Sequence, residues 1–144
     1  MKTKLSQEIK KAMIQKNASR LRALRSIKSQ MDLLETTGKE VTQEMQLSAL
    51  QKMIKQRRES ADIYKSNNRE DLFQVEIEDI LVIEEFLPKQ LSKEEVEEVV
   101  KSIITEVGAT SIRDMGRVMG VVTKSLSGKA DNKVVSEIVK SILN

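Results

Sequence analysis

Proline occurs only once in this chain of 144 residues, at Pro88. Because proline breaks helices and glycine weakens them, one proline and five glycines leave long stretches free to be helical. Lys, Glu, Leu, Ile, Val, Met, Gln and Ser dominate these stretches, and that composition argues against a sandwich or a barrel. We therefore predict an all-α protein.

Apolar residues recur with the 3.6-residue spacing of amphipathic helices along most of the chain. The pattern predicts helices over residues 4–16, 18–36, 43–66, 69–86 and 93–107, a sixth from Ser111 to Gly128, and a seventh after Asp131. Leu5, Ile9, Ala12 and Met13 are expected to share one side of the first helix. The residues expected to cap helix N-termini are Asn17, Thr42, Asn68, Ser92, Ser111 with Asp114, and Asp131.

Pro88 also indicates a domain boundary, because the residue before a proline is pushed out of helical geometry. Ser92 and Glu95 then form a capping-box pattern that opens the next helix. We expect an N-terminal domain of about four helices over residues 1–88 and a C-terminal three-helix bundle over residues 89–144.

The net charge of +3 hides a strong segregation of charge along the sequence. Residues 1–58 carry fourteen Lys and Arg against five Asp and Glu, whereas residues 59–110 carry five against fourteen. Residues 111–144 carry six against three, so two basic regions flank an acidic one. This asymmetry suggests either a polyanionic partner for the basic regions or attraction between the segments themselves.

Cysteine and histidine are both absent, which excludes thiolate chemistry and removes the commonest general base and metal ligand. The sequence therefore predicts no catalytic residue, no metal and no cofactor. A metal cluster of Glu76, Asp79 and Glu84 is disfavoured because no histidine completes it. The lack of cysteine suits a reducing cytoplasm, where we expect the protein. No apolar run approaches the roughly 18 residues of a membrane span, and no signal peptide is recognisable, so no membrane partner is expected.

Two charged residues fall on helix faces that are otherwise apolar. On a helical projection Arg57 lies near the middle of one such face, and Glu76 lies at the centre of another with Asp79 near its edge. Because a buried arginine needs a partner, we predict a structural Arg57–Glu76 ion pair. Arg22 and Arg25 lie on a polar face of the second helix and form a candidate basic surface.

The sixth helix has an apolar face and an opposite basic face. Arg113, Arg117, Gly120 and Lys124 form a row on the basic face, and Gly116 lies beside it. A glycine inside a helix costs about 1 kcal/mol relative to alanine. Gly120 therefore suggests the close approach of another backbone, either a phosphodiester backbone or a neighbouring helix.

Lys129 and Lys133 flank the start of the last helix, where free backbone N–H groups favour an anion. With the row on the sixth helix they make a candidate nucleic-acid surface, although such a set of basic residues is often only a solvated face. Single-strand readers stack bases on aromatic side chains, of which this chain has three. Shape and backbone contacts to a folded RNA such as tRNA therefore fit better.

Four segments of the chain form a recognisable pattern. They are KQRRESADIYKSNNREDL (55–72), EEFLPKQLSKEE (84–95), GATSIRDMGRVMG (108–120) and SGKADNKVVSEIVKSIL (127–143). In order and without large gaps, they resemble the YqeY-like family, also called the GatB/YqeY group, over nearly the whole chain.

The resemblance implies a C-terminal domain similar to the tail of the B subunit of the tRNA-dependent amidotransferase, which acts on glutamyl- or aspartyl-tRNA. That tail is understood to contact the outer corner of tRNA, and similar domains are appended to some glutaminyl-tRNA synthetases. The amidotransferase chemistry belongs to other parts of that enzyme. By this resemblance the tRNA surface is expected at Arg113, Gly116, Arg117, Gly120, Lys124, Lys129 and Lys133.

Three functions are compatible with these patterns. The first is a tRNA-binding accessory module with no catalysis of its own, with an aminoacyl-tRNA synthetase or amidotransferase subunits as further candidate partners. The second is a component of a glutamine-dependent amidotransferase, a carbon–nitrogen ligase with glutamine as amido-N-donor. The third is a helical protein-interaction adaptor that uses the acidic region 59–110 or a groove at Gly116 and Gly120.

Overall fold

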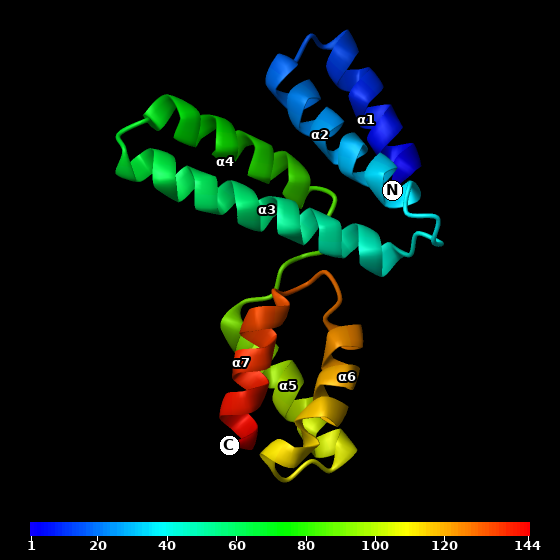
Figure 1. The fold of residues 1–144 in the computed structure, drawn as a ribbon, viewed down its shortest axis with the longest axis vertical. Helices are drawn as coiled ribbons and strands as arrows, with labels where there is room; N and C mark the ends of the chain where they lie inside the picture. Colours follow the sequence, from blue (N-terminus) through cyan, green and yellow to red (C-terminus); the bar gives the residue numbers. More distant parts are fainter. The chain divides into compact units, whose positions relative to one another are not determined.

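The computed structural model describes residues 1–144, and the chain is all-α, which confirms the predicted fold class (Figure 1). Seven α-helices and one short 3-10 helix follow one another without a strand. Their bounds are α1 (Lys2–Ile14), α2 (Ala18–Glu35), α3 (Gln43–Ser66), α4 (Glu70–Glu84), α5 (Lys93–Val107), η1 (Ile112–Asp114), α6 (Met115–Ser125) and α7 (Asn132–Leu143).

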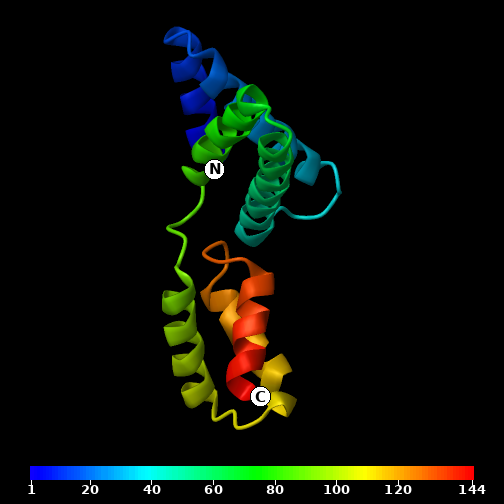
Figure 2. The same ribbon diagram turned by 90° about the vertical axis from the view of Figure 1, so that its left-hand side faces the viewer.

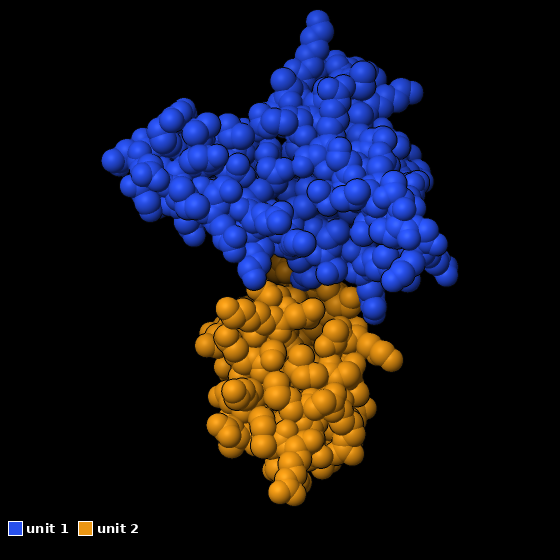
Figure 3. Space-filling view, in the orientation of Figure 1, with its two compact units in different colours: residues 1–88 blue, residues 89–144 orange.

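The chain folds into two compact units, Met1–Pro88 and Lys89–Asn144, which have separate colours in Figure 3. We call them unit 1 and unit 2. Each unit has its own hydrophobic core, and Pro88 is the last residue of unit 1.

Unit 1 consists of two helical hairpins. α1 packs against α2, α3 packs against α4, and α2 joins the hairpins by packing against α4 (Figures 1 and 2). Of the four residues predicted to share one side of α1, Leu5 and Ala12 are buried and Ile9 is partly buried, but 55% of the surface of Met13 is exposed. α1 buries only a narrow stripe through Leu5 and Ala12, and Met13 lies about 100° further round the helix.

Asp79 of α4 is the only charged residue of the chain that is buried, with 4% of its surface exposed. Its carboxylate accepts a hydrogen bond from Arg22 Nη2 of α2 at 3.0 Å and another from Arg57 Nη1 of α3 at 2.8 Å. Arg57 Nη2 also donates to Ser26 Oγ of α2 at 2.7 Å. One carboxylate therefore joins the three helices α2, α3 and α4.

Glu76 is consequently a secondary partner of Arg57. Arg57 Nη1 lies 3.5 Å from Glu76 Oε2, but its shorter contact is with Asp79. The helical projection placed Glu76 at the centre of the apolar face and Asp79 near its edge. α2 covers α4 at that edge, and Arg22 and Arg57 both donate to Asp79 there. A projection of one helix does not show which part of it a neighbouring helix covers.

The basic and acidic segments of the sequence also pair elsewhere in unit 1. Arg20 of α2 donates to Glu85 Oε2, in the acidic segment, at 2.7 Å. It also donates to Glu8 Oε2, within the basic segment, at 2.9 Å. Arg58 of α3 donates to Glu84 of α4 at 3.2 Å. Attraction between segments, one of the two explanations for the segregated charge, therefore operates within unit 1.

Most of the predicted helix caps are present. The side chains of Asn17, Thr42, Ser92 and Asp131 each accept a hydrogen bond from a backbone N–H in the first turn of the following helix. The prediction for Asn68 is wrong. Its φ of 58° places it in the left-handed region after α3, a conformation that asparagine tolerates better than most residues. α4 begins after Arg69 with no side-chain cap.

Unit 2 is a bundle in which α5, α6 and α7 all pack against one another. Its short connections make α6 antiparallel to both neighbours, so α5 and α7 run parallel (Figures 1 and 2). The core of unit 2 is dominated by β-branched residues, eight of eleven in all: Val96, Val100, Ile103, Val118, Val122, Val135, Ile138 and Val139.

The segment before α5 is fixed to the loop between α6 and α7. The backbone N–H of Leu91 donates to the carbonyl of Lys129 at 2.9 Å, and Gln90 Nε2 donates to the carbonyl of Gly128 at 2.6 Å. Gly128 has a φ of 73°, which glycine adopts at little cost. The starts of α5 and α7 are therefore held together at one end of the bundle.

We predict that Asp79→Asn lowers the free energy of unfolding of unit 1 by about 3 kcal/mol, because two arginines lose their shared buried carboxylate. Glu76→Gln, which affects only the 3.5 Å contact, should cost less. Urea unfolding followed by the NMR signals of unit 1 measures both changes. The exposed Lys28–Asp32 pair supplies the control Asp32→Asn, for which little change is expected. Equal effects of Asp79→Asn and Asp32→Asn would contradict the prediction.

Candidate nucleic-acid interface

The turn before α6 positions the start of the basic row. Ser111 and Asp114 form the predicted capping box, and Asp114 Oδ2 also accepts from the Thr110 N–H at 3.0 Å. The box opens the short helix η1 instead of opening α6 directly, and α6 follows at Met115. Arg113 therefore lies in η1, while the rest of the row lies on α6.

Asp114 is held in its ionised form by this turn. The N–H groups of Thr110 and Ser111 lower the pKa of the Asp114 carboxyl from its ordinary value, and Arg117 adds a smaller effect. Arg117 Nη2 donates to Asp114 Oδ1 at 3.3 Å. Sequence reasoning missed this contact, although the i, i+3 spacing of the two residues is the signal for it.

The basic side chains of the row are exposed. Arg113, Arg117 and Lys124 all lie on the solvent side of η1 and α6. Val118 and Val122, on the opposite side of α6, are completely buried in the core of unit 2. α6 therefore has one face that holds it in the bundle and one face that carries positive charge.

The two glycines of α6 lie under open space. No atom of the protein outside their own helix turns lies within 4 Å of the position of a Cβ at Gly116 or Gly120. The interpretation that these glycines allow tight packing between α6 and α7 is therefore wrong. No other part of the chain packs closely against α6 at these two glycines.

Lys129 and Lys133 are also exposed, in the loop after α6 and in the first turn of α7. Because that loop joins the end of α6 to the start of α7, both lysines lie at the Lys124 end of the row, whereas Arg113 lies at the other end of α6. Asp131 Oδ1 accepts from the Lys133 N–H at 3.0 Å. One backbone donor of the α7 N-terminus is therefore already occupied.

The second candidate basic surface lies in unit 1. Arg22 donates to Asp79 at 3.0 Å and lies 3.6 Å from Glu78, so two carboxylates already neutralise its guanidinium. Arg25 is exposed. Arg25 takes part in neither of these ion pairs. Its guanidinium can therefore bind an external anion more readily than that of Arg22.

The acidic side chains form no cluster of three that could hold a metal ion, and this includes Glu76, Asp79 and Glu84. None of the helices combines the length and the apolar character needed to cross a bilayer.

The fold and the exposed row define a class: a small all-α protein of two units, with a basic helix face on its second unit. Comparison with protein-family models is more specific. The family described as Yqey-like protein matches residues 2–143. The chain belongs to this family, which confirms the resemblance noted in its sequence.

Relatives of the chain share one name, "Altered inheritance of mitochondria protein 41, mitochondrial". The relative from Pyrenophora tritici-repentis is 29% identical over 144 residues, which cover 97% of this chain and 79% of the relative. The relative from Clavispora lusitaniae is 30% identical over 125 residues, which cover 85% and 72%. The relative from Meyerozyma guilliermondii is 36% identical over 83 residues, which cover 58% and 44%.

We predict that Asp114→Asn destabilises unit 2 at neutral pH, because an amide oxygen accepts backbone hydrogen bonds more weakly than a carboxylate does. The pKa of Asp114 is lowered in the folded protein, so its stabilising effect is complete above the ordinary carboxyl pKa. The effect is lost as the pH falls through the lowered pKa, and the variant and the parent should then become equally stable.

Urea unfolding at neutral and acidic pH, followed by the NMR signals of unit 2, tests this expectation. Glu106→Gln, at an exposed position of α5, is the matched control and should show no such convergence. A destabilisation by Asp114→Asn that is the same at both pH values would show that the carboxylate charge is not involved.

Proposed function

We propose that this protein is a tRNA-binding accessory module and that the basic face of α6 contacts the tRNA. The observation that carries the proposal is the exposed row of Arg113, Arg117 and Lys124 next to two glycines under open space. Arginine and lysine bind phosphate through charge-assisted hydrogen bonds. A phosphodiester backbone can approach α6 most closely where Gly116 and Gly120 carry no side chain.

The composition of unit 2 favours recognition of RNA shape and backbone. The three aromatic residues, Tyr64, Phe73 and Phe86, all belong to unit 1. Unit 2 therefore has no side chain on which an unpaired base could stack. Contacts with the phosphates of a folded RNA remain available to the row and to Lys129 and Lys133 at its end.

The family resemblance supports tRNA as the folded RNA, since it likens unit 2 to the amidotransferase tail that contacts the tRNA outer corner. An aminoacyl-tRNA synthetase or an amidotransferase is the kind of protein beside which such a module would act. A compartment that contains tRNA follows from the proposal. The absence of cysteine suits the cytoplasm, and the named relatives are described as mitochondrial.

The double variant Arg117→Glu/Lys124→Glu should weaken the binding of bulk tRNA and make it less dependent on salt. Each lost phosphate contact reduces the slope of log K against log salt by roughly 0.7 to 0.9, so the slope should fall by roughly 1.4 to 1.8. Fluorescence anisotropy titrations over a range of salt concentrations measure both quantities.

The matched control is Lys101→Glu/Lys140→Glu, which changes the charge by the same amount at exposed positions of α5 and α7. It should retain most of the affinity and of the salt slope. If the two double variants lose affinity equally, the row on α6 has no special role; if the parent does not bind tRNA, the proposed function is wrong.

Gly120 supplies a separate test, because stability and binding should change in opposite directions. Gly120→Ala should raise the free energy of unfolding of unit 2 by about 0.5 to 1 kcal/mol, since alanine favours helix. Its Cβ meets no neighbouring atom. Gly120→Leu should keep unit 2 folded and weaken tRNA binding more than alanine does. Ser125→Leu, at an exposed position on another side of α6, should leave binding unchanged.

A further inference from the structure

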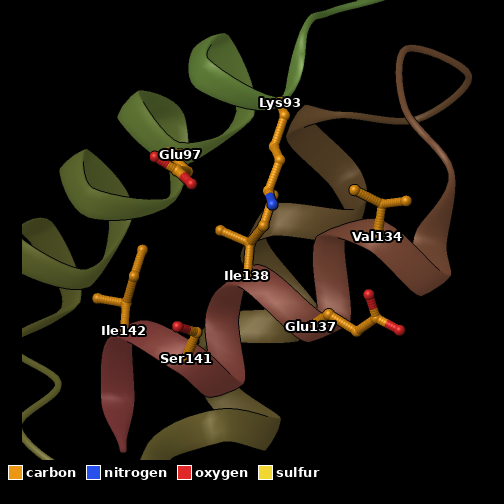
Figure 4. Close-up of a pocket in the computed structure, with 7 residues that line it drawn as sticks. All are labelled: Lys93, Glu97, Val134, Glu137, Ile138, Ser141 and Ile142. Atoms are coloured by element: carbon orange, nitrogen blue, oxygen red, sulfur yellow. The ribbon is translucent and has the colours of Figure 1, made fainter.

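A groove of about 290 Å³ runs between α5 and α7 on unit 2 (Figure 4). Val134, Ile138 and Ile142, spaced one turn apart along α7, form its apolar part. Val134 is 37% exposed and Ile142 is partly buried, whereas Ile138 is only 5% exposed and also belongs to the core of unit 2. α6 contributes no residue to the groove, so the groove is separate from the basic row.

The arrangement of the helices explains why the groove is open. α5 and α7 run parallel, and α6 packs against both of them in the antiparallel direction (Figures 1 and 2). In a four-helix bundle whose successive helices alternate in direction, two antiparallel helices pack against each parallel pair. Unit 2 has only one such helix, α6, against the pair α5 and α7. Unit 2 has three helices, and the groove lies along α5 and α7, where a fourth helix of such a bundle would pack.

Charged residues at the groove are distributed in a way that favours one kind of occupant. Glu97 of α5 lines one side and Glu137 of α7 lines the other, and neither forms an ion pair within the chain. Lys93 lies near the end where α5 and α7 begin, and Figure 4 shows its side chain extending along the groove. Two unpaired carboxylates beside an apolar stripe attract basic residues and repel phosphate.

We propose that this groove binds an amphipathic helix of a partner protein, antiparallel to α5 and α7. The partner helix has aliphatic residues on the face that meets Val134, Ile138 and Ile142, and Lys or Arg on both flanks that meet Glu97 and Glu137. Helices that dock in grooves use anchors at this i, i+3/i+4 spacing.

The antiparallel direction follows from the helix dipoles. The N-termini of α5 and α7 lie at one end of the groove and carry partial positive charge. An antiparallel helix places its C-terminal carbonyl groups at that end. The partner helix and an RNA on α6 would use different helices of unit 2, so this inference does not rest on the proposed tRNA binding.

The full chain and two synthetic peptides of about 18 residues, five helical turns, test the proposal. Both peptides have leucines at positions i, i+4, i+7 and i+11, and they have either lysines or glutamates on the flanks. The lysine peptide should bind roughly tenfold more tightly than the glutamate peptide. Backbone amide signals of α5 and α7 along the groove should shift in NMR spectra.

Glu97→Lys/Glu137→Lys should reverse the preference, so that the glutamate peptide binds more tightly. Glu98→Lys/Glu106→Lys, which makes the same change of charge at exposed positions of α5 outside the groove, should keep the preference of the parent chain. All four positions have exposed or half-exposed side chains, and the NMR spectra of the free variants show directly that they are folded.

A nitroxide spin label on the peptide tests the direction of binding. A label at the peptide C-terminus should broaden the amide signals of Lys93 and Val134, and a label at the N-terminus should broaden that of Ile142. The reverse pattern, equal affinity of the two peptides for the parent chain, or shifts confined to other surfaces would overturn the proposal. So would a dimer of the free protein that covers the same groove, because a second copy would then be the occupant.

Discussion

Unit 1 depends on a single carboxylate that two arginines share. A buried charge is costly unless it is paired and hydrogen-bonded, so Asp79 is compatible with the core only while Arg22 and Arg57 hold it. The three residues come from three helices. The arginines lie in the basic part of the sequence and the aspartate in the acidic part, so the same pairing that satisfies the buried charge also specifies which helices meet.

The two units use their positive charges differently. In unit 1 most arginines bind carboxylates of the same unit, as Arg20, Arg57 and Arg58 do. In unit 2 the α6 row faces solvent, and its one internal contact joins Arg117 to Asp114. Most arginines of unit 1 thus serve the fold, whereas the basic face of α6 in unit 2 is exposed. Membership of the YqeY-like family extends across both units.

Local patterns in the sequence were enough to predict the all-α fold and most helix ends, because composition, apolar spacing and side-chain caps act within one or two turns. Features that depend on a neighbouring helix were not predictable in this way. The main partner of Arg57 is Asp79 because α2 covers that edge of α4. Asn68 adopts a left-handed conformation after α3, where a cap for α4 was expected. That Gly120 packs against no other helix of the chain became clear only from the space around it.

The β-branched core of unit 2 has a consequence for binding. A valine or isoleucine in a helix has essentially one χ1 rotamer, so eight of the eleven core residues have little side-chain freedom in either the free or the bound state. The helices that carry the basic row and the groove are therefore held by an interior with few alternative packings. A ligand on either surface meets a preorganised framework, and most of the entropy lost on binding comes from the long exposed side chains and from the ligand itself.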